Sequence, residues 1–169
     1  MMPRPARAIF RVGVICSLVL TAACSGGEPE ESQPTQAAAA PPSDAPPLPE
    51  APPADDTTTL AGVTLAEFPG DAAAGEAVFI QCQTCHTTEA GVNRIGPSLA
   101  GIVGRHAGTI PDFSYSPANV NSGITWTPDK LFQYLENPQR VVPGTKMTYN
   151  GVQDPQQRAN LIAWLGTKT

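Results

Sequence analysis

The sequence carries little positive charge. Its 169 residues include 10 Lys and Arg against 15 Asp and Glu, and residues 67–169 hold 7 basic and 8 acidic side chains. Binding to nucleic acid requires a surplus of Lys and Arg on one face, because contacts to phosphates supply much of the affinity. The composition therefore argues against a nucleic-acid partner. The length leaves room for one compact domain and a non-globular segment, but not for a second full domain.

Residues 25–66 contain no aromatic residue, no lysine and no arginine. They hold seven of the acidic residues and 9 of the 19 prolines. Such a composition buries too little apolar surface to offset the entropy cost of ordering the chain. We therefore expect a disordered linker over residues 24–66 and a single domain over residues 67–169. The linker acts either as a plain spacer or as an arm along which the domain travels.

The sequence has no apolar run of the roughly 20 residues that a membrane-spanning helix requires. Its longest run extends from Val12 to Ala23 and follows three arginines. A basic start, a short apolar core and small residues before the cleavage point are typical of a secretory signal. Residues 1–23 are therefore predicted to be a signal peptide.

The end of this run, LTAAC at residues 20–24, resembles the lipobox of bacterial lipoproteins. The resemblance implies that Cys24 is lipidated, although Thr21 stands where lipoboxes favour leucine. An uncleaved N-terminal helix anchor and ordinary cleavage to a soluble product are the alternatives. In all three cases we expect the domain outside the cytoplasm, on the periplasmic side of a bacterial membrane. Cys16 lies within the apolar run and has no predicted role.

The pattern C-x-x-C-H, from Cys82 to His86, is the attachment motif of c-type haem. Two thiols three residues apart on one turn can each form a thioether, and the adjacent histidine then faces the iron. A thioredoxin-like pair, half of a zinc site and a plain disulfide are competing interpretations. Zinc requires four ligands, and the domain offers only Cys82, Cys85, His86 and His106. We therefore predict one covalent haem c.

Met147 and His106 are the candidates for a second iron ligand. Met147 is the only methionine after the signal peptide and lies in the turn-rich segment PGTKM, residues 143–147. His106 lies between glycines and is better explained as an exposed loop histidine. A thioether opposite a histidine favours an electron carrier over an oxygen activator.

Two helices are predicted from their termini. Thr127-Pro128-Asp129 combines an N-cap, a proline at the first helical position and an acid in the first turn, and this helix must stop before Pro138. Asp154-Pro155 repeats the pattern for a helix that ends near Gly166. Gly75 would let the first helix approach the last closely. The residues predicted to be core are Phe79, Phe132, Leu135, Leu161 and Trp164.

Residues 68–169 resemble a class I cytochrome c of the mitochondrial type. The resemblance implies an all-α fold, in which helices wrap around one covalently bound haem, and no enzymatic activity. The motifs that carry it are GD at 70–71, Gly75, Phe79, CQTCH at 82–86, GPSL at 96–99, GR at 104–105, FSYSPAN at 113–119, GITW at 123–126, YLENP at 134–138 and PGTKM at 143–147.

The resemblance also implies a role for each site residue. Cys82 and Cys85 form the thioethers, His86 and Met147 are axial ligands, and the Pro97 carbonyl accepts the other imidazole N–H. The haem propionates are surrounded by Arg105, Tyr115 and Trp126. The polar set near the methionine sulfur and a buried water consists of Tyr134, Asn119 and Thr145.

The predicted function is that of a membrane-tethered, monomeric one-electron carrier. Its partners would be redox protein complexes, such as a bc-type donor and a terminal oxidase in a respiratory chain. The alternative is a haem peroxidase or gas sensor in which Met147 leaves the iron.

Mitochondrial cytochromes surround the exposed haem edge with lysines, whereas this domain has only Lys130, Lys146 and Lys168. Charge steering should therefore be weak, and tethering could compensate for it. Tyr149 stands where the family often has phenylalanine.

Overall fold

The structure is a computed structural model, and it describes residues 46–169. The predicted signal peptide, the lipidation site at Cys24 and the first part of the predicted linker lie outside the described residues. Within residues 46–169 the structure contains no strand, only one isolated bridge between His106 and Thr125. Across the same residues, none of the helices combines the length and apolar character needed to cross a membrane.

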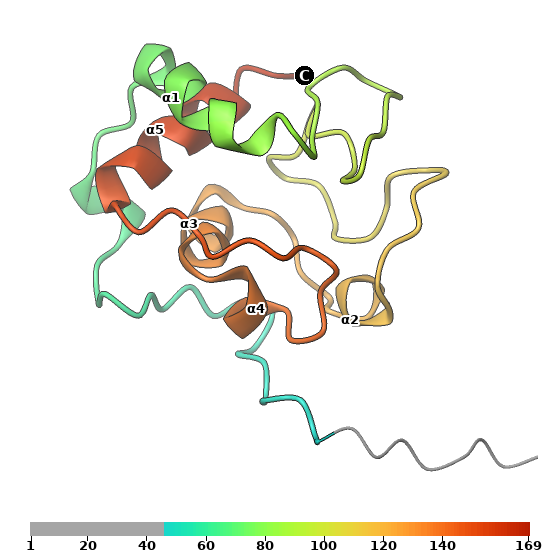
Figure 1. The fold of residues 1–169 in the computed structure, drawn as a ribbon. Coiled ribbons are helices and arrows are strands. Elements are labelled where there is room, and N and C mark those ends of the chain that lie inside the picture. Colours follow the sequence, from blue (N-terminus) through green and yellow to red (C-terminus); the bar gives the residue numbers. More distant parts are fainter. Residues whose placement is uncertain (1–45) are drawn as a thin grey trace, which may run out of the picture. The chain divides into compact units, whose positions relative to one another are not determined.

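The described part of the chain is helical, which confirms the predicted all-α fold. Figure 1 shows α1 and α5 side by side, with α3 near the middle of the domain and a long loop between η2 and α2. The elements are η1 (Leu65–Glu67), α1 (Ala72–Phe79), η2 (Ile80–Cys82), α2 (Pro117–Val120), α3 (Pro128–Glu136), α4 (Pro138–Val141) and α5 (Pro155–Leu165).

The starts of α3 and α5 are those predicted from the sequence. The Thr127 side chain accepts a hydrogen bond from the backbone N–H of Lys130, and Pro128 is the first residue of α3. The Asp154 side chain accepts from two backbone N–H groups at the start of α5, which begins at Pro155. These caps satisfy amide groups that have no partner within the helix. Asn137 ends α3 in an extended conformation and caps α4.

Gly75 allows α1 and α5 to cross at close range. A Cβ at this position would overlap the carbonyl oxygen of Asn160 on α5. Next to the crossing, the rings of Phe79 and Trp164 lie 4.5 Å apart, centroid to centroid. All five residues predicted to be core are buried. The crossing fixes the end of α1, from which the C-x-x-C-H segment continues.

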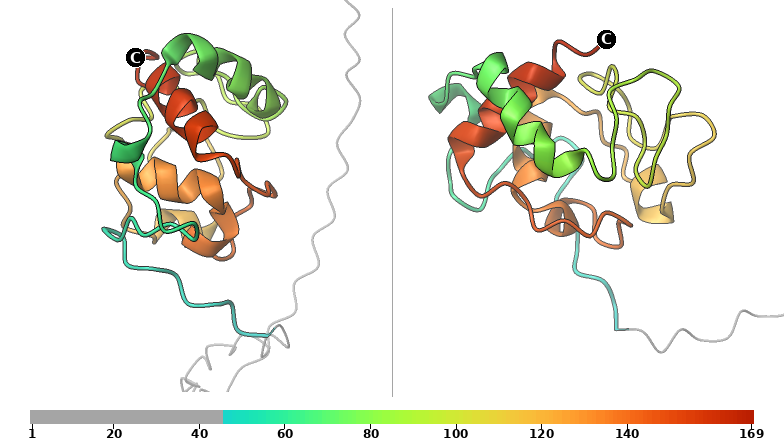
Figure 2. Two further views of the ribbon diagram at one scale, coloured as in Figure 1. Left: turned by 90° about the vertical axis from the view of Figure 1, so that its left-hand side faces the viewer. Right: turned by 45° about the horizontal axis from the view of Figure 1, so that its top comes forward.

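The prediction of a disordered linker up to residue 66 is wrong for residues 53–66, which make hydrogen bonds within the segment and to the helices. Residues 53–61, which we call the strap, are bonded to α3 and α4. Figures 1 and 2 show this segment, in teal, running beside the two helices. The composition did not reveal it because the strap contributes mainly backbone groups, whereas the side chains that bind them come from α3 and α4. The folded part of the chain therefore begins before residue 67.

Candidate functional site

A cavity of about 490 Å³ occupies the centre of the domain. This volume falls within the range of cofactor and ligand sites in proteins. Its walls come from α1, η2, the loop before α2, α3, α5 and the segment around Met147. Every residue predicted to bind the cofactor lines it, namely Cys82, Cys85, His86, Pro97, Arg105, Tyr115, Asn119, Trp126, Tyr134, Thr145 and Met147.

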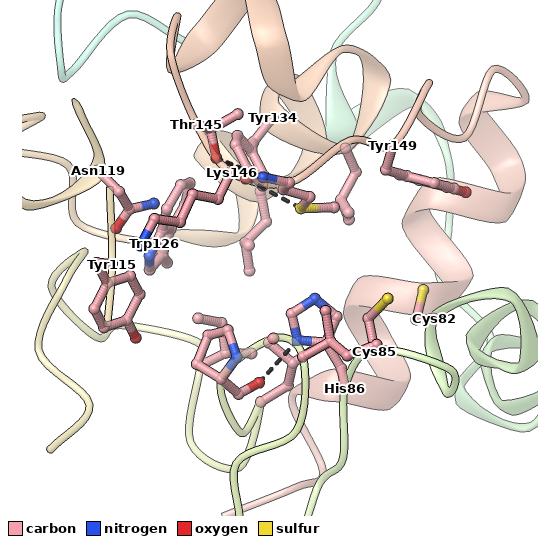
Figure 3. Close-up of a pocket in the computed structure, with 18 of the residues that line it drawn as sticks. Cys82, Cys85, His86, Tyr115, Asn119, Trp126, Tyr134, Thr145, Lys146 and Tyr149 are labelled. Carbon is pink, nitrogen blue, oxygen red and sulfur yellow. Dashed lines mark hydrogen bonds between the residues drawn. The ribbon is translucent and has the colours of Figure 1, made fainter. Parts of the chain in front are cut away.

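The two cysteines and His86 are brought together by a tight turn after η2. The backbone N–H groups of Cys85 and His86 both donate to the carbonyl of Cys82, at 3.1 and 2.9 Å. Their side chains consequently lie together at one wall of the cavity (Figure 3). Neither cysteine is in a disulfide. Burial raises the pKa of Cys82 to about 11, whereas reactive thioredoxin-like cysteines have lowered pKa values.

The His86 ring is held in one orientation. Its Nδ1 lies 2.8 Å from the carbonyl oxygen of Pro97 and, as the protonated nitrogen, donates to it (Figure 3). Nε2 is then the unprotonated nitrogen and is free to bind a metal. Burial lowers the pKa of His86, which favours the neutral, ligating form of the imidazole. Gly96 leaves room for the ring, because a Cβ there would overlap it.

Met147 lines the cavity together with Tyr134 and Thr145, which Figure 3 shows on the wall across from His86. The Tyr134 hydroxyl donates to the Met147 sulfur at 3.2 Å. Burial raises the pKa of Tyr134 to about 12, so the phenol keeps its proton at neutral pH and stays a donor. The amide of Gln139, on α4, donates to the Met147 carbonyl at 2.7 Å.

The remaining predicted residues form a polar end of the cavity. Arg105 donates to the carbonyls of Ala100 and Ser98, at 2.8 and 3.1 Å, and burial lowers its pKa. Asn119 is 9% exposed, and its Oδ1 has no hydrogen-bond partner among the described residues. An unpaired buried acceptor at the cavity wall requires a donor, such as a bound water. The Arg105 guanidinium at the wall fits an acidic group, and the haem propionates are acidic.

The structure also separates residues that the sequence analysis considered together. His106 is exposed, does not line the cavity, and has its Nδ1 3.0 Å from the Thr125 hydroxyl. Sequence reasoning missed Gln81, whose side chain accepts a hydrogen bond from the Tyr149 hydroxyl at 2.5 Å. It also missed the role of Gln139. Neither glutamine stands in a pattern that could have indicated it.

A helical domain around a deep cavity, with two thiols and a histidine at one wall and a thioether at another, defines a c-type haem protein. Residues 72–169 match the cytochrome c family, and the chain belongs to this family. Proteins of this family carry a covalently bound c-type haem and transfer electrons, and Cys82 and Cys85 occupy the attachment motif. The cavity, the Arg105 guanidinium on its wall and the fixed imidazole fit that group.

Several known proteins are similar to the domain. Cytochrome c2 from Rhodopila globiformis is 56% identical over 100 residues, which cover 59% of this chain and 94% of that protein. Cytochrome c from Guizotia abyssinica is 45% identical over 109 residues, covering 63% of this chain and 98% of that protein. The solved structure of cytochrome cH from Methylobacterium extorquens matches with a TM-score of 0.57 and 45% identity, covering 59% of this chain and 100% of that one.

Proposed function

We propose that this protein is a one-electron carrier whose haem iron is held by His86 and Met147. When bound, haem c supplies an iron that accepts and releases one electron. The observation that supports this ligand pair is that both side chains are held in advance. Pro97 orients the His86 ring from one side of the cavity, and Tyr134 donates to the Met147 sulfur from another.

The chain contributes a rigid site. The bond to Pro97 keeps His86 in one tautomer, and the bonds from Tyr134 and Gln139 keep Met147 in place. Groups that are already paired need little rearrangement when the charge of the site changes. A preorganised site of this kind suits electron transfer.

The other site residues have proposed roles in binding the macrocycle. Arg105, Tyr115 and Trp126 bind the propionates at the polar end. Asn119, Tyr134 and Thr145 form the polar set near the sulfur and a buried water. Support comes from their shared position on the cavity wall and from the unpaired Asn119 oxygen.

We further propose that the domain works on the periplasmic side of a bacterial membrane. The support is the basic, apolar and small-residue pattern of residues 1–23 and the lipobox-like LTAAC that ends at Cys24. A lipidated Cys24 would tether the domain as a monomer near redox protein complexes, with a bc-type donor and a terminal oxidase or other acceptor as partners. Tethering raises the effective concentration at such partners without strong docking contacts.

A visible spectrum of the oxidised protein, purified from membranes in detergent, tests the ligand pair. We expect the weak far-red band that reports methionine sulfur bound to Fe(III). Met147→Ala should keep the covalent haem but lose this band and lower the reduction potential, because the thioether raises it. Met147→His should restore six-coordination without the band.

Three results would contradict the proposal. The far-red band could be absent from the native protein, or it could persist in Met147→Ala. Rapid and complete binding of carbon monoxide or cyanide by the native protein at neutral pH would also overturn it. An open sixth position of that kind would favour a peroxidase or a gas sensor instead.

A further inference from the structure

The strap, residues 53–61, lies outside the part of the chain that matches the cytochrome c family, residues 72–169. It nevertheless makes hydrogen bonds to α3 and α4 through residues more than 70 positions away in sequence. Its contacts therefore come from outside the matched family domain. Through three sets of buried or partly buried side chains, these contacts connect the strap to both ends of the segment that carries Met147, residues 142–153.

The first contact is with two polar residues on one face of α3. The Lys130 ammonium donates to the carbonyls of Pro53 and Asp56, at 3.2 and 2.7 Å. The Gln133 amide donates to the Asp56 carboxylate and the Thr58 carbonyl, at 2.6 and 3.0 Å. Lys130 is 2% exposed and Gln133 is 0% exposed. Lysine is almost never buried without partners, so this face of α3 is matched to the strap.

The second contact joins the strap to a buried ion pair. The Glu136 carboxylate accepts from the backbone N–H groups of Leu60 and Ala61, at 2.5 and 3.2 Å. It also pairs with Arg158 at 3.3 Å, and the two side chains are 4% and 0% exposed. Arg158 in turn donates to the carbonyls of Val152 and Gln153, at 2.8 and 3.1 Å. The strap is thereby connected to the C-terminal end of the segment that carries Met147.

The third contact reaches the other end of that segment through α4. The Arg140 guanidinium donates to the Thr58 carbonyl at 3.1 Å. Its neighbour Gln139 donates to the carbonyl of Met147 at 2.7 Å. The helix that positions Met147 is therefore itself fixed to the strap.

We propose that the strap is a positioning element for Met147. The strap accepts a hydrogen bond from Arg140 and donates two to the Glu136 carboxylate. These bonds keep the segment from Val142 to Gln153 closed over the cavity. This inference rests on the proposed role of Met147 as an iron ligand. A competing ligand reaches the iron only in the open state, so its apparent affinity measures the open fraction. The strap lowers that fraction.

Leu60→Pro tests the inference without touching the cavity. Leu60 is 63% exposed and is the second residue of a turn closed by the N–H of Gly62 and the carbonyl of Thr59. Proline is favoured at this turn position, so the substitution mainly removes the N–H that Glu136 accepts. Leu60→Ala is the matched control, because it shortens the same exposed side chain and keeps the N–H.

The measurement is imidazole binding to the oxidised, full-length holoprotein at constant pH. We expect Leu60→Pro to bind imidazole about tenfold more tightly than Leu60→Ala, because a buried charged acceptor has lost a partner. Arg140→Gln provides a second variant that acts through α4, and we expect it to tighten imidazole binding severalfold. Free energies of unfolding, measured by denaturant on the same proteins, separate local opening from global stability.

The inference is overturned if Leu60→Pro and Leu60→Ala bind imidazole equally, even where Leu60→Pro has a lower free energy of unfolding. If Leu60→Pro does not fold, unchanged imidazole affinity in Arg140→Gln overturns it instead. Failure of the proposed ligand pair is distinguishable, because the native protein would then lack the far-red band before any variant is compared.

Discussion

Gly96 controls the orientation of His86 although it has no side chain. A Cβ at this position would overlap the imidazole ring. The ring is also held by Pro97, the next residue, through the 2.8 Å bond to its carbonyl. A single methyl group at residue 96 would therefore act on both the position of the ring and its hydrogen bond.

We expect Gly96→Ala to displace the imidazole and to destabilise the protein by about 1–3 kcal/mol, the usual cost of overpacking a filled site. The free energy of unfolding and the reduction potential of the holoprotein would measure the two effects. Gly166→Ala is the control, because its φ is −60° and the nearest atoms to a Cβ lie at 3.4 and 3.5 Å. If the two variants behave alike, the contact with His86 has no role.

At the scale of elements, helix starts could be predicted and the strap could not. Thr127 and Asp154 act on amides two or three residues away, so a local pattern reveals them. The strap depends on contacts between residues 74 to 82 positions apart, and most of its acceptors are backbone carbonyls, which every residue possesses. No local pattern distinguishes such carbonyls from those of a disordered segment.

The same difference applies to the site. The C-x-x-C-H motif is local, and it predicted the attachment wall of the cavity directly. The polar residues came from the family resemblance, since residues as distant as Arg105 and Thr145 meet only in the fold. Gln139 was missed because its bond to the Met147 carbonyl depends on where α4 lies.

The strap should make stability depend on acid pH through Asp56. The Thr58 hydroxyl, at 2.7 Å, and the Gln133 amide stabilise the carboxylate and lower the pKa of Asp56 below its ordinary value of 3.8. A lowered folded-state pKa adds stability above pH 3.8, and that stability is lost as the pH falls through the folded-state value.

We therefore expect Asp56→Asn to reduce the free energy of unfolding at pH 7, by less than about 1 kcal/mol because the group is partly exposed. The difference from the native protein should shrink as the pH falls below 3.8. Denaturant unfolding at a series of pH values measures it. Glu50→Gln removes an exposed carboxylate from the same stretch of chain and should show no such convergence. A difference that stays constant down to pH 2 would contradict the assignment to Asp56.

At the scale of the whole molecule, the structure buries one of the three lysines that could guide docking by charge. Lys130 is 2% exposed and bonded to the strap. The Lys146 ammonium donates to the carbonyl and hydroxyl of Ser114, and the Lys168 ammonium lies 4.3 Å from the centre of the Trp164 ring. At the cavity edge stands Ile95, which is 76% exposed. The cavity edge therefore presents an exposed apolar side chain, and Lys146 is the one lysine among the described residues that line the cavity.

A surface of this kind should exchange electrons at rates that depend little on ionic strength. Salt screens charge–charge attraction over about 10 Å at 0.1 M, so only a site with concentrated charge loses much of its rate. We expect stopped-flow rates with ferricyanide, and with a tris-phenanthroline cobalt cation, to change less than about twofold between low and physiological salt. Ile95→Lys places a cation at the cavity edge, so its rate with ferricyanide should rise at low salt and fall as salt is added. If the ferricyanide rate of the native protein already falls steeply as salt is added, its exposed cations together attract the anion. Partner recognition would then rest on charge.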